Sequence, residues 1–406
     1  MPQSIAVIAA LIVGLIVGVA IDASDSAMLR DAALTIRPIG VLWLSLLQMT
    51  VIPLIVSLLI TGIASATSTA ATGGLTARAL LIFLVFLTGA ATLAALLVPL
   101  MLELWSVSRA AAEALRGSVS ANAALPDAPA LGNFFDNIVP RNPFKAAADG
   151  ALLPLAVFAL FFGMAVARIN ETRRAVVLSF FEGVSEAMMI VVQWVLWIAP
   201  LGIFALTIKI GLDGGFAVAG TIGQYVLMMC IVAVVVTLAM YVVVAFSRGI
   251  SVARFARAAI PAQAVAFSTQ SSLASLPAML TATASAGVPQ QVGSVVLPLA
   301  VSLFRLTSPP VNLAVVLFVA HVYGIPIGPA QLALGVGVAV ITSLAIAGLP
   351  GTVNFFATTV PISLSLGVPI ELLPLLIAVE VVPDIFRTVG NVTADMTVAT
   401  LLGRGP

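Results

Sequence analysis

Five polar or charged side chains recur at helical spacing near the C-terminus of this chain. They are Glu380, Asp384, Arg387, Asn391 and Asp395, at intervals of four, three, four and four residues. At about 100° per residue they fall within roughly 80° of arc, so they share one face of a helix whose other faces are apolar. A guanidinium such as that of Arg387 can hold a carboxylate through two parallel hydrogen bonds. The stripe therefore predicts a wet, buried binding site; the alternative is a salt-bridged stripe that only holds helices together.

The composition places this stripe in a membrane protein. The chain has 406 residues, of which 61% are hydrophobic and 8% charged, whereas a soluble domain carries about 25% charged residues. Apolar runs long enough to cross a bilayer recur along the chain, so we expect an all-α polytopic membrane protein. The net charge of +1 argues against a nucleic-acid partner. The single cysteine, Cys230, excludes a disulfide framework and a cysteine metal site, and no metal site or cofactor is expected.

Two apolar segments in the second half are interrupted by Ser, Thr, Gly and Pro. They are AFSTQSSLASLPAMLTATASAGVP at 266–289 and ITSLAIAGLPGTVNFFATTVPISLSLGVP at 341–369. Non-helical backbone at membrane depth is tolerated only where it is buried in protein or lines a cavity. The pattern therefore predicts paired re-entrant hairpins beside a binding site, with kinked ordinary helices as the alternative.

Several motifs in this order resemble the dicarboxylate/amino acid:cation symporters, which include the glutamate and aspartate transporters. They include VIPLIVSLLITGIAS (51–65), AFSTQSSLASLP (266–277), AGLPG (347–351) and DIFRTVGNVTADM (384–396). The resemblance implies eight transmembrane helices and two re-entrant hairpins built from inverted repeats, assembled as a homotrimer. It implies a scaffold and trimerisation portion at 1–77 and 110–212. It also implies a transport portion at 78–109 and 213–406, with hairpins near 251–289 and 329–369.

The resemblance also assigns roles to residues. Arg387 would clamp the side-chain carboxylate of the substrate and Asp384 its amino group, with Thr388 and Asn391 adding neutral donors and acceptors. Ser271 and Ser272 at the first hairpin tip would receive the substrate α-carboxylate. The tip of the second hairpin would include Leu349 and Gly351 and act as the extracellular gate.

One segment departs from the family pattern. Family members carry N-M-D-G-T in the unwound middle of the seventh helix, where it builds sodium sites, whereas this chain has Phe304-Arg305-Leu306-Thr307-Ser308. Phenylalanine and leucine offer no side-chain oxygen to a cation. Thr88 and Asp395 keep two positions that the resemblance connects with ion coupling, and Asn391 shares that role. Ordinary sodium coupling is therefore in doubt.

We hypothesise that Arg305 is a tethered cation that replaces a bound sodium ion and neutralises Asp395 or Asp384. Transport would then be driven by protons or by exchange, and Glu380 is the natural proton carrier because a carboxylate removed from water binds a proton more readily. The alternative is that Arg305 only balances the acidic stripe.

Together these features predict a non-enzymatic secondary transporter of an acidic amino acid or C4-dicarboxylate. We expect it to use an elevator mechanism in a bacterial inner membrane, with that substrate and the lipid bilayer as its partners. Two alternatives remain: a substrate-gated anion or solute pore, and an ordinary sodium symporter whose ion sites are built from backbone oxygens.

Overall fold

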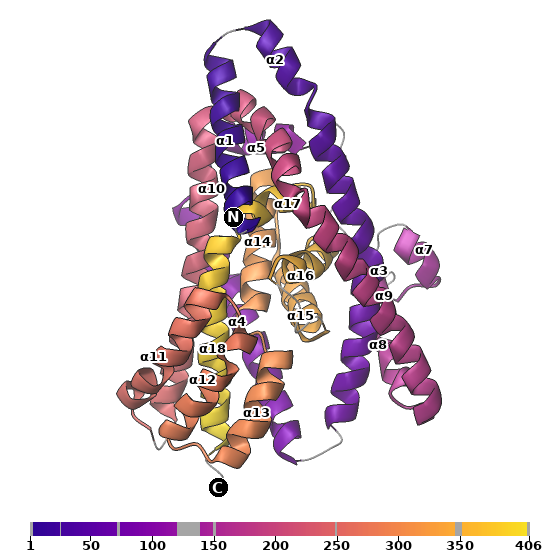
Figure 1. Ribbon diagram of the computed structural model, residues 1–406, viewed down its shortest axis with the longest axis vertical. Coiled ribbons are helices and arrows are strands. Elements are labelled where there is room, and N and C mark those ends of the chain that lie inside the picture. Colours follow the sequence, from indigo (N-terminus) through magenta and orange to yellow (C-terminus); the bar gives the residue numbers. More distant parts are fainter. Residues whose placement is uncertain are drawn as a thin grey trace.

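The computed structural model describes residues 3–24, 26–70, 74–119, 139–148, 152–247, 250–345 and 351–403. These residues form helices joined by turns and short loops, and no strand occurs among them (Figure 1). The helices of the first half are α1 (Gln3–Ala23), α2 (Ala27–Leu34), α3 (Arg37–Ala70), α4 (Gly74–Leu104), α5 (Arg109–Val119), α7 (Pro143–Ala148), α8 (Leu152–Val166) and α9 (Glu171–Trp197). Those of the second half are α10 (Ala199–Phe246), α11 (Val252–Thr269), α12 (Ser272–Ser285), α13 (Gln290–Leu303), α14 (Ser308–Tyr323), α15 (Pro329–Ala345), α16 (Gly351–Ser365), α17 (Leu373–Leu376), the 3-10 turn η1 (Ile377–Val379) and α18 (Val381–Leu402).

Four stretches within the described residues are long and apolar enough to cross a membrane. They are Gly74–Leu104, Glu171–Trp197, Gly220–Phe246 and the interrupted pair Gln290–Tyr323. Shorter apolar helices accompany them, including parts of α1, α8, α15 and α16. The all-helical membrane architecture predicted from composition is thus present.

Two features of the helices around α10 bear on the expected organisation. The apolar stretch across residues 176–208 forms two helices, because α9 ends at Trp197 and α10 begins at Ala199. Pro200 lies in the first turn of α10, where a missing N–H costs nothing. Conversely, α10 continues through residues 212 and 213, so the structure shows no helix break at the expected boundary between scaffold and transport portions.

Glycines let α10 pack closely against α1. A Cβ on Gly18 would lie 2.2 Å from the carbonyl oxygen of Ile208, and one on Gly211 would lie 2.5 Å from that of Leu15. Small residues of this kind allow helix backbones to approach in a membrane, where apolar burial gives little driving force. The N-terminal helix is therefore held along the first part of α10.

Helix pairs occupy both segments that we expected to form hairpins. α11 and α12 pack against each other and are joined by Gln270, which adopts a left-handed conformation at φ 52°, and Ser271. α15 and α16 also pack together, and the residues between them, 346–350, lie outside the described part of the chain. None of these four helices is among the described stretches that are both long and apolar enough to cross a membrane.

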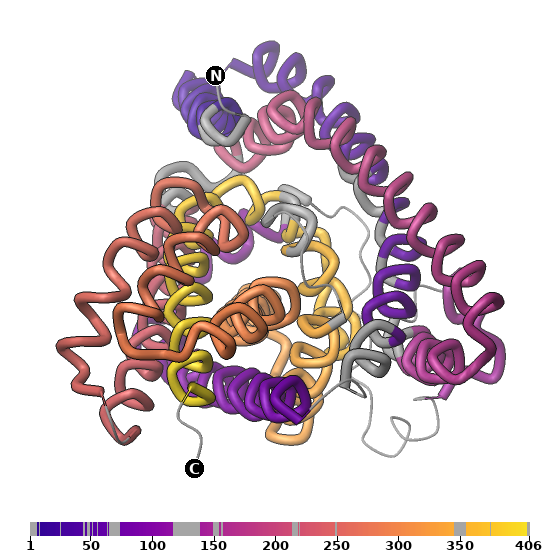
Figure 2. Tube along the Cα trace, turned by 60° about the horizontal axis from the view of Figure 1, so that its bottom comes forward, coloured from indigo at the N-terminus to yellow at the C-terminus, as the bar shows by residue number. Residues whose placement is uncertain are grey.

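The C-terminal helix α18 occupies the middle of one half of the molecule. It packs against α4, α10, α11, α12 and α13, and residues 387–388 and 390–400 are buried (Figures 1 and 2). Between α13 and α14, residues 304–307 leave the helical conformation. On the opposite side, α3, α8 and α9 pack together and lie away from α18 (Figure 2). The fold thus surrounds the polar stripe with helices and places an interrupted helix beside it.

Candidate functional site

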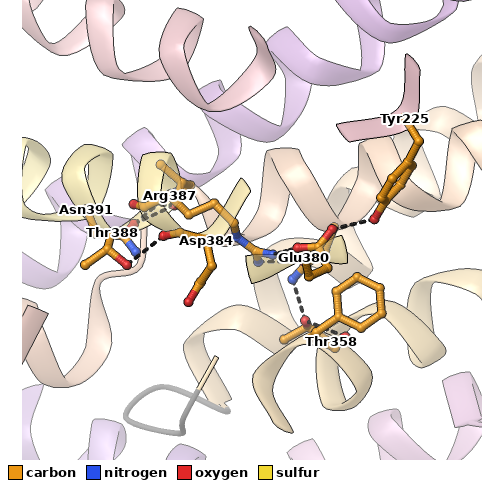
Figure 3. A network of polar contacts seen from close by, with 10 residues as sticks. Tyr225, Thr358, Glu380, Asp384, Arg387, Thr388 and Asn391 are labelled. Atoms are coloured by element: carbon orange, nitrogen blue, oxygen red, sulfur yellow. Dashed lines mark hydrogen bonds and ion pairs between the residues drawn. The ribbon is translucent and has the colours of Figure 1, made fainter. Parts of the chain in front are cut away.

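Arg387 is the centre of the polar stripe and is already bound by two protein groups. Its Nη1 forms an ion pair with Glu380 Oε2 at 3.0 Å, and its Nη2 donates to Asn312 Oδ1 at 2.7 Å (Figure 3). Arg387 is 4% exposed and Glu380 6% exposed. Each terminal nitrogen of the guanidinium therefore has one partner within the protein, and a carboxylate ligand that takes the same N–H groups competes with these partners.

The contacts of Arg387 extend to two further helices. The hydroxyl of Tyr225, on α10, donates to Glu380 Oε1, and Asn312 Nδ2, on α14, donates to Thr358 Oγ1 on α16 (Figure 3). All of these side chains are buried. A continuous polar chain thus joins α10, α18, α14 and the second helix of the α15–α16 pair.

A second set of contacts fixes the interrupted segment on α18. The Thr307 N–H donates to Asn391 Oδ1 at 2.9 Å, and Thr307 Oγ1 lies 2.9 Å from the same oxygen and 3.1 Å from the Arg387 carbonyl oxygen. Gly390 permits this approach, because a Cβ there would lie 2.6 Å from both Thr307 Cγ2 and Thr237 Oγ1. Asn391 therefore acts here as an anchor for the non-helical backbone.

Asp384 and Thr388 form the more open part of the stripe. Asp384 is partly buried, and its carboxylate points away from the Arg387–Glu380 ion pair (Figure 3). The Thr388 hydroxyl donates to the Asp384 carbonyl oxygen at 2.8 Å. Among the described residues no hydrogen bond to the Asp384 carboxylate is found, so this negative group is available one turn from Arg387.

Asp395 of the stripe and Arg305 of the interrupted segment carry buried polar atoms that lack a hydrogen bond among the described residues. Both carboxylate oxygens of Asp395 and Nε of Arg305 are buried without a hydrogen bond in the part of the chain that the structure describes. Arg305 lies in the same part of the molecule as Asp384 and Asp395 and is opposite to them in charge. Within the described residues no ion pair joins it to either carboxylate.

Sequence comparisons identify the class of protein that carries this site. The chain matches the sodium:dicarboxylate symporter family over residues 4–404. This chain belongs to the sodium:dicarboxylate symporter family. Membership in a symporter family makes it a membrane transporter rather than an enzyme, as the sequence motifs predicted.

Individual relatives cover most of the chain. It is 31% identical over 377 residues to the proton/sodium-glutamate symport protein of Bacillus subtilis, covering 91% of this chain and 86% of that protein. It is 27% identical over 372 residues to the proton/glutamate-aspartate symporter of Escherichia coli, covering 90% and 84%. It is 26% identical over 373 residues to the C4-dicarboxylate transport protein of Rhizobium johnstonii, covering 90% and 82%.

This member of the symporter family has apolar side chains at two positions that the motif assigns to sodium ligands. Phe304 is buried and stacks on Phe83 of α4, with ring centroids 4.5 Å apart and planes 10° apart. Leu306 is buried in the same apolar cluster, which also contains Val392 and Met396 of α18. Rings and methyl groups thus occupy space where side-chain oxygens were expected.

The remaining predicted residues lie outside this polar chain. Ser271 caps α12 by accepting from the Ala274 N–H at 3.2 Å, and Ser272 begins that helix; no described hydrogen bond joins either serine to the stripe. Leu349 lies outside the described residues, and Gly351 begins α16. Thr88 is exposed on α4, where its carbonyl oxygen accepts from Thr92.

Sequence reasoning missed three members of the polar chain: Tyr225, Asn312 and Thr358. Each is a polar side chain in a strongly apolar helix, and Asn312 is the only amide within α14. For Asn312 that isolation was the available signal, because a polar group within a bilayer needs a partner.

Proposed function

We propose that this protein is a secondary transporter of an acidic amino acid or a C4-dicarboxylate. The observation that carries the proposal is the buried Arg387 on α18, with the available carboxylate of Asp384 one turn away. A guanidinium selects a carboxylate, and an adjacent negative charge favours an ammonium group on the same ligand. The three relatives are named for glutamate, glutamate-aspartate and C4-dicarboxylate transport, which supports the same substrate class.

We propose that coupling uses protons or substrate exchange rather than sodium sites of the ordinary kind. The Phe304–Phe83 stack and the buried Leu306 support this, because neither side chain can ligate a cation. Arg305 would supply a fixed positive charge near Asp395, whose buried carboxylate has no described hydrogen-bond partner. An uncompensated buried carboxylate is costly, so a nearby tethered cation has a physical role.

The proposed transporter has eight transmembrane helices and two re-entrant hairpins, formed by the α11–α12 and α15–α16 pairs. It acts as a homotrimer in a bacterial inner membrane, with the scaffold and transport portions at the residue ranges given above. Its transport portion moves the site across the membrane as an elevator. The position of α18 away from the α3–α8–α9 group supports such a division, with α10 and α4 packing against both α18 and α3 (Figure 2).

Uptake into proteoliposomes tests the proposed function. Radiolabelled aspartate, glutamate and succinate are supplied with sodium and proton gradients imposed separately, or with unlabelled substrate inside. We expect saturable uptake driven by a proton gradient or by internal substrate. Strict dependence on sodium would overturn the coupling proposal and favour ion sites made from backbone oxygens and Asp395, whereas non-saturating flux would favour a pore.

Replacement of Arg305 tests the tethered cation directly. The Arg305→Met variant restores the uncharged residue of the family motif, so sodium-independent uptake should fall and uptake should become sensitive to sodium. Arg257→Met is the matched control, because it removes an exposed arginine from α11. If the Arg305 variant keeps both the uptake and the ion dependence of the wild type, the hypothesis that Arg305 replaces a sodium ion is wrong.

A further inference from the structure

The guanidinium expected to bind substrate is held by a carboxylate of the protein itself. Glu380 approaches Arg387 at 3.0 Å, and the opposite oxygen of Glu380 accepts a hydrogen bond from Tyr225. The Tyr225 ring is fully buried and packs on Phe318, with ring centroids 5.1 Å apart. The phenol is therefore fixed by packing, and its hydroxyl holds Glu380 toward Arg387.

A substrate carboxylate that binds Arg387 through Nη1 competes with this internal carboxylate for the same cation. If Glu380 stayed ionised while a substrate displaced it, a buried negative charge would lose its main counter-charge, which is strongly unfavourable. Protonation of Glu380 removes that charge and leaves Arg387 positive. Binding of one substrate carboxylate to Arg387 is therefore most favourable when Glu380 takes up one proton.

Few other charged or titratable groups face Glu380. Tyr225 and Cys230 approach it from α10, and Asp384 and Arg387 belong to its own helix. The described α17 has no titratable side chain, and Asp22 of α1 pairs with Arg30 at 3.9 Å. Arg387 is therefore the cation that Glu380 can lose when substrate binds.

We propose that Glu380 is a tethered competitor for the substrate carboxylate on Arg387, and that Tyr225 is the positioning residue that holds it there. The exchange balances as follows: the Glu380 carboxylate leaves Arg387 and binds one proton from solution, and the substrate carboxylate takes its place on Arg387. No covalent bond other than the O–H bond of Glu380 forms. This inference rests on the proposed function and assigns the proton linkage to one pair of residues.

Binding of L-aspartate to the purified full-length protein in lipid nanodiscs tests the inference. Isothermal titration calorimetry from acidic to mildly alkaline pH compares the wild type with Glu380→Gln and Tyr225→Phe. In the wild type, the apparent Kd should rise by up to about tenfold per pH unit once Glu380 loses its proton. Glu380→Gln should bind at least about tenfold more tightly at alkaline pH and lose that pH dependence.

Tyr225→Phe should retain the pH dependence but shift it. Loss of a hydrogen bond to the charged carboxylate makes protonation easier, so the transition should move about one pH unit to the alkaline side. Tyr241→Phe is the matched control, because the Tyr241 hydroxyl accepts from Gln263 Nε2 at 2.8 Å and belongs to a different contact. A purely structural role for Tyr225 would lower thermal stability without this shift.

Different binding results would overturn the competition by Glu380 and the proposed transport function. Equal pH dependence in the wild type and Glu380→Gln overturns the inference while leaving the transporter intact. Weaker binding by a folded Glu380→Gln variant also overturns it, since removal of a competitor cannot weaken binding. Absence of aspartate, glutamate and succinate binding in the folded wild type and in Glu380→Gln at every pH overturns the proposed function itself.

Discussion

Helices α18 and α9 show opposite relations between polarity and burial. α18 carries Asp384, Arg387 and Asp395, yet Arg387 is 4% exposed and Asp395 fully buried. α9 ends in two tryptophans, Trp194 and Trp197, whose exposed fractions are 68% and 79%. The charged residues of α18 are enclosed by its neighbours, whereas α9 presents both its charged residues and its two tryptophans outward.

The difference concerns which side chains the single chain keeps inside. The exposed apolar side chains of α9 lie in the proposed trimerisation portion, on a surface suited to lipid or to a second protomer. Charged side chains on α18 are costly in lipid and are retained inside, where they pair or face a binding site. Substitutions made in parallel on the two helices therefore test this division.

Among the paired substitutions on α18 and α9, replacement of an arginine should give the largest difference, measured as substrate uptake. Arg387→Gln removes the cation proposed to bind the substrate carboxylate, and loss of one partner of a buried charge pair across a binding interface typically costs about 2–5 kcal/mol. Uptake of acidic substrate should consequently fall by roughly 30-fold or more. Arg173→Gln, which removes an exposed arginine from α9, is the control and should leave uptake within about twofold. Similar losses in both variants would contradict the assignment of Arg387 to the site.

Truncation of a phenylalanine should have the next largest effect. Phe304→Ala removes a fully packed ring stacked on Phe83, and changes of this kind cost about 3–5 kcal/mol in stability. Phe180 of α9 is 64% exposed and contacts only the edge of Phe181 among the rings described, so Phe180→Ala should cost about 1 kcal/mol or less. Thermal unfolding of the purified variants in one detergent measures both, and equal midpoints would show that Phe304 is not tightly packed.

The smallest contrast compares two Gly→Ala substitutions. A Cβ on Gly390 would meet Thr237 Oγ1 and Thr307 Cγ2 at 2.6 Å, so Gly390→Ala should destabilise the protein by about 1–3 kcal/mol. A Cβ on Gly183 of α9 would meet no atom within 4 Å, so Gly183→Ala should stabilise the helix by about 0.5–1 kcal/mol. Opposite shifts of the unfolding midpoint are expected, and a stabilising Gly390→Ala would show that Thr307 does not lie tightly against α18.

The sequence alone determined the membrane class, the symporter family and the polar face of α18. Composition and helical spacing can be read from the sequence directly, so they do not require knowledge of the fold. The interruption beside Arg305 was predictable as well, because the resemblance places it in the unwound middle of a helix and the two prolines Pro309 and Pro310 follow directly. The departure from the sodium motif was also visible directly in residues 304–308.

Only the tertiary structure determined which groups form hydrogen bonds and ion pairs with the polar side chains of that face. Tyr225 and Glu380 are 155 residues apart, and Asn312 and Arg387 are 75 residues apart, so no local pattern connects them. The stacking of Phe304 on Phe83 likewise depends on how α4 lies against the interrupted helix. Helical spacing states which side chains share a face, but the partner of each side chain depends on how separate helices pack, and packing is a property of the whole chain.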